Sequence, residues 1–120
     1  MPNQIVWCDI PVNELDRAVK FYNAVLDASL KKESFPGLDL ALLPGATDAV
    51  SGCLFKNNDA NPGAEGPLVY LNCSGRLDSA IAAVEANGGK VILSKHQIGP
   101  HGFRAVVLDS EGNRVALHSM

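Results

Sequence analysis

The chain has 120 residues, of which 47% are hydrophobic and 19% charged, and its formal net charge is -3; these values are typical of one soluble globular domain. Its lysines and arginines are scattered, which argues against a nucleic-acid-binding surface, and no apolar run approaches the ~18 residues that a membrane span needs. Three cysteines without CxxC spacing favour reduced thiols, and the first residues do not resemble a signal peptide, so we expect a cytoplasmic protein.

The first part of the chain predicts a strand, a helix and three more strands. A run rich in β-branched and aromatic residues indicates a strand at 5–10. Asn13 is expected to cap the helix that follows, with Asp16 in its first turn. That helix is indicated by apolar residues at helical spacing, namely Leu15, Ala18, Val19, Tyr22, Val25 and Leu26. Three further strands are expected, at 28–34, 38–43 and 52–56, with Pro36-Gly37 as the turn between the first two.

A linker of turn-forming residues at about 57–67 precedes a second series of elements in the same order. The expected elements are a strand at 68–73, a helix at 77–87, a strand at 90–96 and a hairpin of strands at 103–108 and 113–119. Gly88-Gly89 should end the helix, and Gly112 should be the left-handed residue of the hairpin loop. A further turn is expected at Gly99-Pro100.

The two halves form an internal repeat. Leu15 lies over Leu77 at a shift of 62, whereas the opening strands match better at about 61, so one residue is inserted near Gly75-Arg76. Such a repeat predicts a single α+β domain, 1–120, made of two βαβββ modules at 1–58 and 68–120. The modules are expected to form one curved mixed sheet with the helices outside.

Three motifs carry a family resemblance. They are "IPVNELDRAVKFYNAVLDA" at 10–28, "VEANGGKVI" at 84–92 and "LDSEGNRVALHS" at 108–119. In this order they resemble the vicinal oxygen chelate superfamily, which includes glyoxalases, bleomycin- and fosfomycin-resistance proteins, extradiol dioxygenases and epimerases. The resemblance implies a U-shaped cup of eight strands around a divalent metal ion, with each module supplying one ligand from its first strand and one from its last. It also implies a homodimer, by analogy alone.

The metal positions implied by the resemblance hold unsuitable residues. They fall at Trp7, at Leu68 or Val69, at Ala116, and within 52–54, where Cys53 is the one side chain able to coordinate. Metal ligation requires carboxylate, imidazole or thiolate donors that converge. We therefore expect no metal site at these positions and no cofactor.

Alternation along the strands predicts which side chains line the cup. With Trp7 in the ligand position, Val6, Cys8 and Ile10 should pack against the helix. The inward side chains of the three relevant strands are then Trp7, Asp9, Tyr70, Asn72, Arg114, Ala116 and His118. Aromatic walls with a few polar groups are typical of a small-molecule pocket.

Two of these residues are candidate catalytic groups, because a carboxylate and an imidazole can transfer protons near neutral pH: Asp9 and His118. The candidate ligand-binding residues are Trp7, Tyr70, Asn72, Arg114 and His101, the last in a glycine-proline loop expected near a mouth of the cup.

Most of these residues also have a structural interpretation. Trp7 either stacks on a ligand or fills the space of a missing metal ion. Asp9 either acts as a base or pairs with Arg114 or Arg104. Tyr70 and Asn72 either contact a ligand or satisfy each other and nearby backbone groups.

The histidines have alternatives of their own. His118 either has a chemical role or faces solvent inertly. His96 and His101 are either solvated or form, with His118, an alternative metal site. The acidic segment 109–113 is expected to be a structural hairpin with side chain–backbone hydrogen bonds.

Three functions remain open. The leading hypothesis is a metal-independent member of the superfamily that binds a small, partly aromatic or electrophilic molecule, with or without lyase or isomerase chemistry. The second is a metal-dependent glyoxalase-type lyase, and the third is a non-enzymatic interaction or regulatory module whose cup is filled by its own side chains.

Overall fold

The computed structural model describes residues 3–36, 38–46, 48–56 and 60–120. Each half contains a strand, a helix and three strands. The first module holds β1 (Trp7–Pro11), α1 (Leu15–Leu26), β2 (Lys31–Phe35), β3 (Leu38–Leu42) and β4 (Ser51–Lys56). The second holds β5 (Val69–Asn72), α2 (Leu77–Ala86), β6 (Lys90–Gln97), β7 (Phe103–Leu108) and β8 (Arg114–Ser119). The expected α+β class with two βαβββ modules is confirmed.

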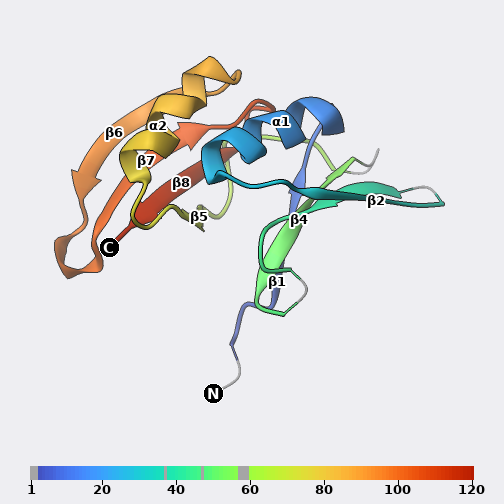
Figure 1. Ribbon diagram of the computed structural model, residues 1–120, viewed down its shortest axis with the longest axis horizontal. Coiled ribbons are helices and arrows are strands. Elements are labelled where there is room, and N and C mark those ends of the chain that lie inside the picture. The colour runs from blue at the N-terminus through green and yellow to red at the C-terminus, as the bar shows by residue number, and fades with distance from the viewer. Residues whose placement is uncertain (1–2, 37, 47, 57–59) are drawn as a thin grey trace.

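The strands form two mixed sheets of four. One has the order β1-β4-β3-β2 and the other β5-β8-β7-β6, with β1 parallel to β4, β5 parallel to β8 and the other pairs antiparallel. Figure 1 shows α1 and α2 side by side above the two sheets, which extend away from the helices in different directions. One face of each sheet is therefore packed against the helices, and among the described elements no helix or strand lies over the other face.

The structure confirms the inserted residue of the repeat. The backbone N–H groups of Val12 and Cys73 occupy equivalent places, since they donate to Phe55 O at 2.9 Å and to His118 O at 2.7 Å. Val12 and Cys73 are 61 positions apart, whereas the helices begin at Leu15 and Leu77. The extra residue lies in the turn before α2, where Gly75 has a φ of +80°.

The core lies between the helices and the sheets. Ala18, Tyr22 and Val25 on one face of α1 are fully buried, as the helical spacing predicts, and Phe21, which the spacing did not include, is fully buried beside them. Ile10 is also buried, and Cys8 packs against the same core. Val6 does not: it precedes β1 and is 69% exposed, so its predicted packing on the helix is wrong.

The start of α1 is capped by a distant residue. Asn13 was expected to be the cap, but the cap position is Glu14, and its side chain makes no capping hydrogen bond. Instead, Oε1 of Glu111, on the loop between β7 and β8, accepts the backbone N–H groups of Asn13 and Glu14 at 2.9 Å each. Arg17 on the first turns of α1 adds two hydrogen bonds to the same carboxylate. This loop therefore joins the second module to the first.

The β7–β8 loop is the structural hairpin that the sequence predicts. Asp109 Oδ1 accepts the backbone N–H groups of Glu111 and Asn113 at 2.8 and 2.9 Å. Its Oδ2 accepts the hydroxyl of the buried Tyr22 at 2.5 Å. Gly112 has a φ of +86°, as expected.

The other predicted turns agree where the structure describes them. Gly88 follows α2 with a φ of +93°, and a short 3-10 helix, Gly99–His101, stands at the predicted Gly99-Pro100 turn. The turn at Pro36-Gly37 and the first residues of the linker, 57–59, lie partly or wholly outside the described residues. Over the described ranges, no helix is long and apolar enough to cross a membrane.

Candidate functional site

Apart from His101, which lies in the 3-10 helix between β6 and β7, the candidate residues lie on the sheet faces opposite the helices. In the first sheet, the strand register places Asp9 beside Cys53 on β4 and Trp7 beside Ser51. In the second, Tyr70 is beside Ala116, and Asn72 is beside His118. Alternation therefore assigns these side chains to the faces predicted from the sequence, and each sheet carries one group of them.

The first group is a hydrogen-bonded cluster of Trp7, Asp9 and Cys53. The indole Nε1–H of Trp7 donates to Asp9 Oδ1 at 2.8 Å, and the Cys53 thiol lies 3.4 Å from the same oxygen. Burial, followed by the hydrogen bond to Asp9, raises the pKa of Cys53 to about 11, so this thiol stays protonated at neutral pH. Trp7 itself is 40% exposed.

The second group is centred on Arg104, in β7. Its Nη1 donates to the Tyr70 hydroxyl at 2.6 Å, and its Nε–H donates to His96 Nε2 at 2.9 Å. His96 Nδ1 lies 2.8 Å from the backbone oxygen of Ser94. An imidazole that donates from Nδ1 and accepts at Nε2 is neutral, so the hydrogen bonds define both the tautomer and the charge of His96.

His118 stands beside this second group and is held by the predicted loop. Its Nε2 lies 2.6 Å from the backbone oxygen of His101, which accepts the N–H, and its ring meets the Tyr70 ring edge to face with centroids 6.0 Å apart. His118 is half-buried rather than freely solvated. His101 contributes its carbonyl, and its exposed imidazole has no recorded contact with the cluster.

Ala116 explains how the second group fits on the sheet. Tyr70 in β5 and Arg104 in β7 belong to the two neighbours of β8, so the hydrogen bond between them crosses over β8. The register places Tyr70 beside Ala116 and Arg104 beside His118. Ala116 is fully buried, although its side chain is only a methyl group, because the side chains that cross over β8 cover it. A small residue at this position leaves room for the crossing side chains.

Arg114 and Asn72 are occupied elsewhere. Arg114 Nη2 donates to the backbone oxygen of Gly66 in the linker at 3.0 Å, and Asn72 Oδ1 accepts the backbone N–H of Ser74 at 2.9 Å. Arg114 and Asp9 both line a cavity of about 640 Å³ where the linker passes between the modules. No ion pair between Asp9 and Arg114 or Arg104 occurs within the described part of the chain, so the alternative in which Asp9 pairs with either arginine is not formed.

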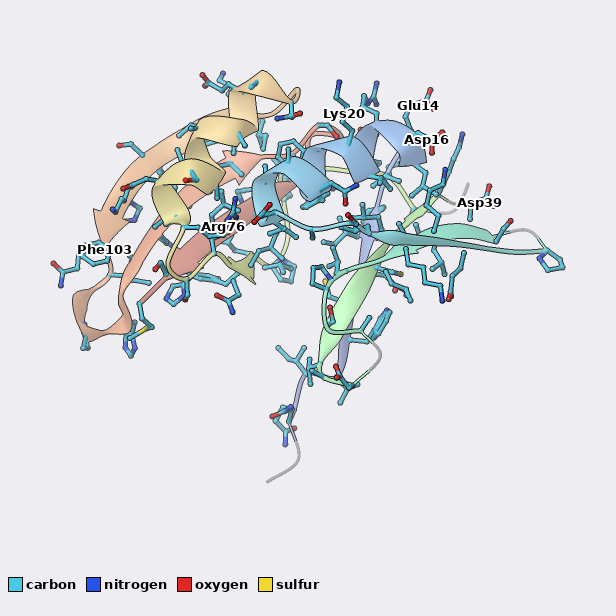
Figure 2. The ribbon with its side chains drawn as sticks, viewed as in Figure 1. Glu14, Asp16, Lys20, Asp39, Arg76 and Phe103 are labelled. Atoms are coloured by element: carbon cyan, nitrogen blue, oxygen red, sulfur yellow. The ribbon has the colours of Figure 1, made fainter. Side chains whose placement is uncertain are left out.

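A separate cavity of about 530 Å³ lies at the start of α1, lined by charged side chains. Figure 2 shows Glu14 and Asp16 at this end of the helix, with Asp39 on the sheet below. Asp16 pairs with Lys32, and Asp39 accepts the Ser34 hydroxyl at 2.7 Å. Two pairs of its polar side chains therefore bond to each other, and it contains none of the predicted site residues.

The structure places Trp7 and Asp9 in one group and Tyr70 and His118 in or beside the other, whereas Arg114 and Asn72 belong to neither. No hydrogen bond, ion pair or ring contact described for residues 3–36, 38–46, 48–56 and 60–120 joins Trp7 or Asp9 to Tyr70 or His118. The sequence did not predict that Arg104 bonds to both Tyr70 and His96. The register of β6, β7 and β8, which places His96, Arg104 and His118 in one row, is what brings them together.

The metal ion that the family resemblance implies does not fit these residues. The implied positions hold an indole, Leu68 or Val69, the methyl of Ala116 and the protonated thiol of Cys53, a set with at most one donor. Within the described residues, no three His, Cys, Asp or Glu side chains converge. The alternative site of His96, His101 and His118 is therefore not formed, since His96 and His118 use ring nitrogens on Arg104 and on the backbone.

Comparisons with known proteins agree with this fold. The model of the Glyoxalase/Bleomycin resistance protein/Dioxygenase superfamily matches residues 4–117. No curated protein sequence matches the chain. A glyoxalase I variant from Zea mays aligns with a TM-score of 0.76 at 20% identity, over 98% of this chain and 46% of that one.

Two further structures are similar over nearly the whole of both chains. A glyoxalase/bleomycin resistance protein from Albidiferax ferrireducens has a TM-score of 0.71 and 18% identity, covering 98% of this chain and 99% of its own. A fosfomycin resistance protein from Listeria monocytogenes has a TM-score of 0.71 and 12% identity, covering 100% and 95%. At these identities the likeness concerns the fold alone.

Proposed function

Because this chain belongs to the Glyoxalase/Bleomycin resistance protein/Dioxygenase superfamily, we propose that it binds a small, partly aromatic or electrophilic molecule without a metal ion at the positions implied by the family. The observation that carries the proposal is the second group on the uncovered sheet face. Tyr70 is 47% exposed there, beside a guanidinium and two imidazoles. An exposed aromatic ring with convergent polar groups is the usual chemistry of a ligand site.

Lyase or isomerase chemistry would use Asp9 and His118. His118 donates from Nε2 to the loop carbonyl, and in the neutral ring this leaves Nδ1 with the lone pair that a base needs to accept a proton from a ligand. Asp9 holds the Trp7 indole through Oδ1, and its Oδ2 has no recorded partner among the described side chains. Each group is suited to the role of base without a metal ion.

We propose further that two copies of the chain share the cup. Within one chain the Trp7 group and the Tyr70 group lie on different sheets with no recorded contact between them, and both aromatic side chains are exposed. A second copy could cover these faces and bring one group of each kind together. Light scattering on the purified protein tests this: a dimer supports it, and a monomer at every concentration contradicts it.

The ligand is tested by a thermal-shift screen of small aromatics, antibiotics and thiol adducts, followed by titration of the fluorescence of Trp7, the single tryptophan of the chain. A ligand that raises the melting temperature supports the proposal, and Tyr70→Ala should then weaken its binding. A screen without any shift would favour the interaction or regulatory module instead.

Metal-dependent glyoxalase chemistry is tested separately. Metal analysis of the purified protein is combined with a turnover assay on the methylglyoxal–glutathione adduct in the presence of nickel or zinc. Stoichiometric metal with turnover would overturn the metal-independent proposal. Asp9→Ala and His118→Ala test the acid–base roles, and unchanged turnover or binding in both variants would leave these residues structural.

A further inference from the structure

The second sheet is positively charged in a protein that is acidic overall. Its four strands contain four Lys or Arg residues, namely Lys90, Lys95, Arg104 and Arg114, and no Asp or Glu. The strands of the first sheet contain three of each sign. The whole chain has 13 acidic and 10 basic residues. The cationic character therefore belongs to one sheet.

Arg104 is the cation on this sheet that lies in the candidate site. The ion pairs of the described residues involve Arg17, Lys31, Lys32 and Lys95, and none involves Arg104. Its hydrogen-bond partners are the Tyr70 hydroxyl and the His96 ring, and a neutral phenol and a neutral imidazole accept these hydrogen bonds. Its guanidinium also lies 5.9 Å from the centre of the Tyr70 ring. Arg104 thus keeps its charge without a carboxylate to neutralise it.

The two partners hold the guanidinium without using all of its donors. Arginine has five N–H groups, and hydrogen bonds are recorded from Nε and Nη1, whereas Nη2 has none among the described residues. A guanidinium fixed at two points has lost most of its rotamer freedom before a ligand arrives. The Nη atoms can then meet an oxyanion with little further ordering.

We propose that Arg104 is an oxyanion subsite, which takes the carboxylate or phosphonate group of a ligand whose aromatic part lies against Tyr70. This rests on the proposed ligand-binding function and adds the charge that the ligand carries. His96 is a positioning residue, because its neutral ring accepts from Nε and keeps the guanidinium extended over β8. The shared chemistry of both ligand groups is a pair of oxygens that accept from one guanidinium.

The experiment compares three probes of similar shape: benzoate, phenylphosphonate and the neutral benzamide. Binding to the wild-type protein is measured by calorimetry and by the melting temperature. We expect at least one of the two anions to bind about tenfold or more tightly than benzamide, which is the gain typical of a hydrogen bond to a charged group. The better of the two anions identifies the geometry that the subsite prefers.

Variants assign the preference to one residue. Arg104→Gln should lower the affinity for the anions much more than the affinity for benzamide, so that the preference is lost. Arg104→Lys should restore only part of the preference, because lysine keeps the charge but cannot donate two parallel hydrogen bonds. Lys90→Gln is the matched control, since it removes one positive charge from an exposed residue of β6 with no recorded contact to the site. Circular dichroism confirms that each variant is folded.

A direct readout is the ¹⁵N–¹H signal of Arg104 Nε, which should shift with the anion and not with benzamide. Equal affinity for the anions and benzamide in the wild type, or a preference that survives Arg104→Gln, would overturn the oxyanion subsite and leave the proposed ligand site standing. If none of the three probes binds, the small-molecule proposal fails for this ligand class, and the subsite fails with it.

Discussion

Replacing Glu111 by glutamine tests whether a single buried carboxylate joins the two modules. The Glu111 side chain is fully buried, and it accepts hydrogen bonds from two backbone N–H groups at the start of α1 and from Arg17 Nε and Nη2 at 2.7 and 2.9 Å. Glutamine keeps one carbonyl oxygen for the helix cap but turns an NH₂ group towards the Arg17 donors. The variant therefore loses the charge and gains an unfavourable donor–donor contact.

The size of the effect follows from the pKa of Glu111. Burial alone would raise it, but the hydrogen bonds from Arg17 and from the backbone at Glu14 outweigh burial and lower the pKa from 4.5 to about 2. At about 1.4 kcal/mol per pH unit, this corresponds to about 3 kcal/mol of stability. Arg17 is 53% exposed, and solvent screening reduces its share. We expect Glu111→Gln to cost about 2 kcal/mol at neutral pH.

The stabilisation has a defined pH dependence. A carboxyl with a lower pKa in the folded state stabilises the fold fully above its ordinary value of 4.5 and loses this contribution as the pH falls towards about 2. The stability difference between the wild type and Glu111→Gln should therefore shrink to about half or less near pH 3. The same reasoning predicts that the wild type is the more acid-sensitive of the two proteins.

Urea unfolding followed by far-ultraviolet circular dichroism measures both quantities. At neutral pH the expected loss corresponds to a melting temperature lower by roughly 8 °C for a chain of this size. Glu85→Gln, on the exposed side of α2, is the matched control and should change stability by less than about 0.5 kcal/mol. A loss that is equal at neutral pH and near pH 3 would refute the charge-based account, and a loss no larger than that of the control would refute the joining role.

Three other predictions concern stability and metal content. Tyr22→Phe should lower the free energy of unfolding in urea by about 1.5–3 kcal/mol, because the buried Asp109 carboxylate loses its hydroxyl donor. Tyr70→Phe, at an exposed tyrosine, is the control and should cost less than about 0.5 kcal/mol. Equal losses in the two variants would contradict this account. Gly52→Ala should lower the free energy of unfolding by about 3 kcal/mol or more, since its Cβ would lie 2.1 Å from a backbone oxygen of β1. Gly63→Ala is the control, because its Cβ would meet nothing within 4 Å. A folded Gly52→Ala of wild-type stability would show that β1 and β4 can separate freely. Chelation by EDTA should leave the melting temperature unchanged, and a clear fall would reveal a structural metal ion.

Local patterns in the sequence were sufficient to predict the elements and their faces. The spacing of Leu15, Ala18, Tyr22 and Val25 predicts both the helix and its buried side, because a helix repeats its direction every 3.6 residues. The period of two in a strand separates Ile10 on the packed face from the residues beside it. The repeat then predicts two modules of the same kind, since the same order of strand and helix patterns occurs twice along the chain.

The contacts of the site depended on the tertiary structure. The cap of α1 comes from a residue 97 positions away in the chain, and no local rule connects a hairpin loop to the start of a distant helix. Arg104 was considered in the sequence only as a partner of Asp9, but strand order places it between His96 and Tyr70. Alternation states which face a side chain takes; which side chains meet on that face depends on strand order and register, and these result from the packing of the whole chain.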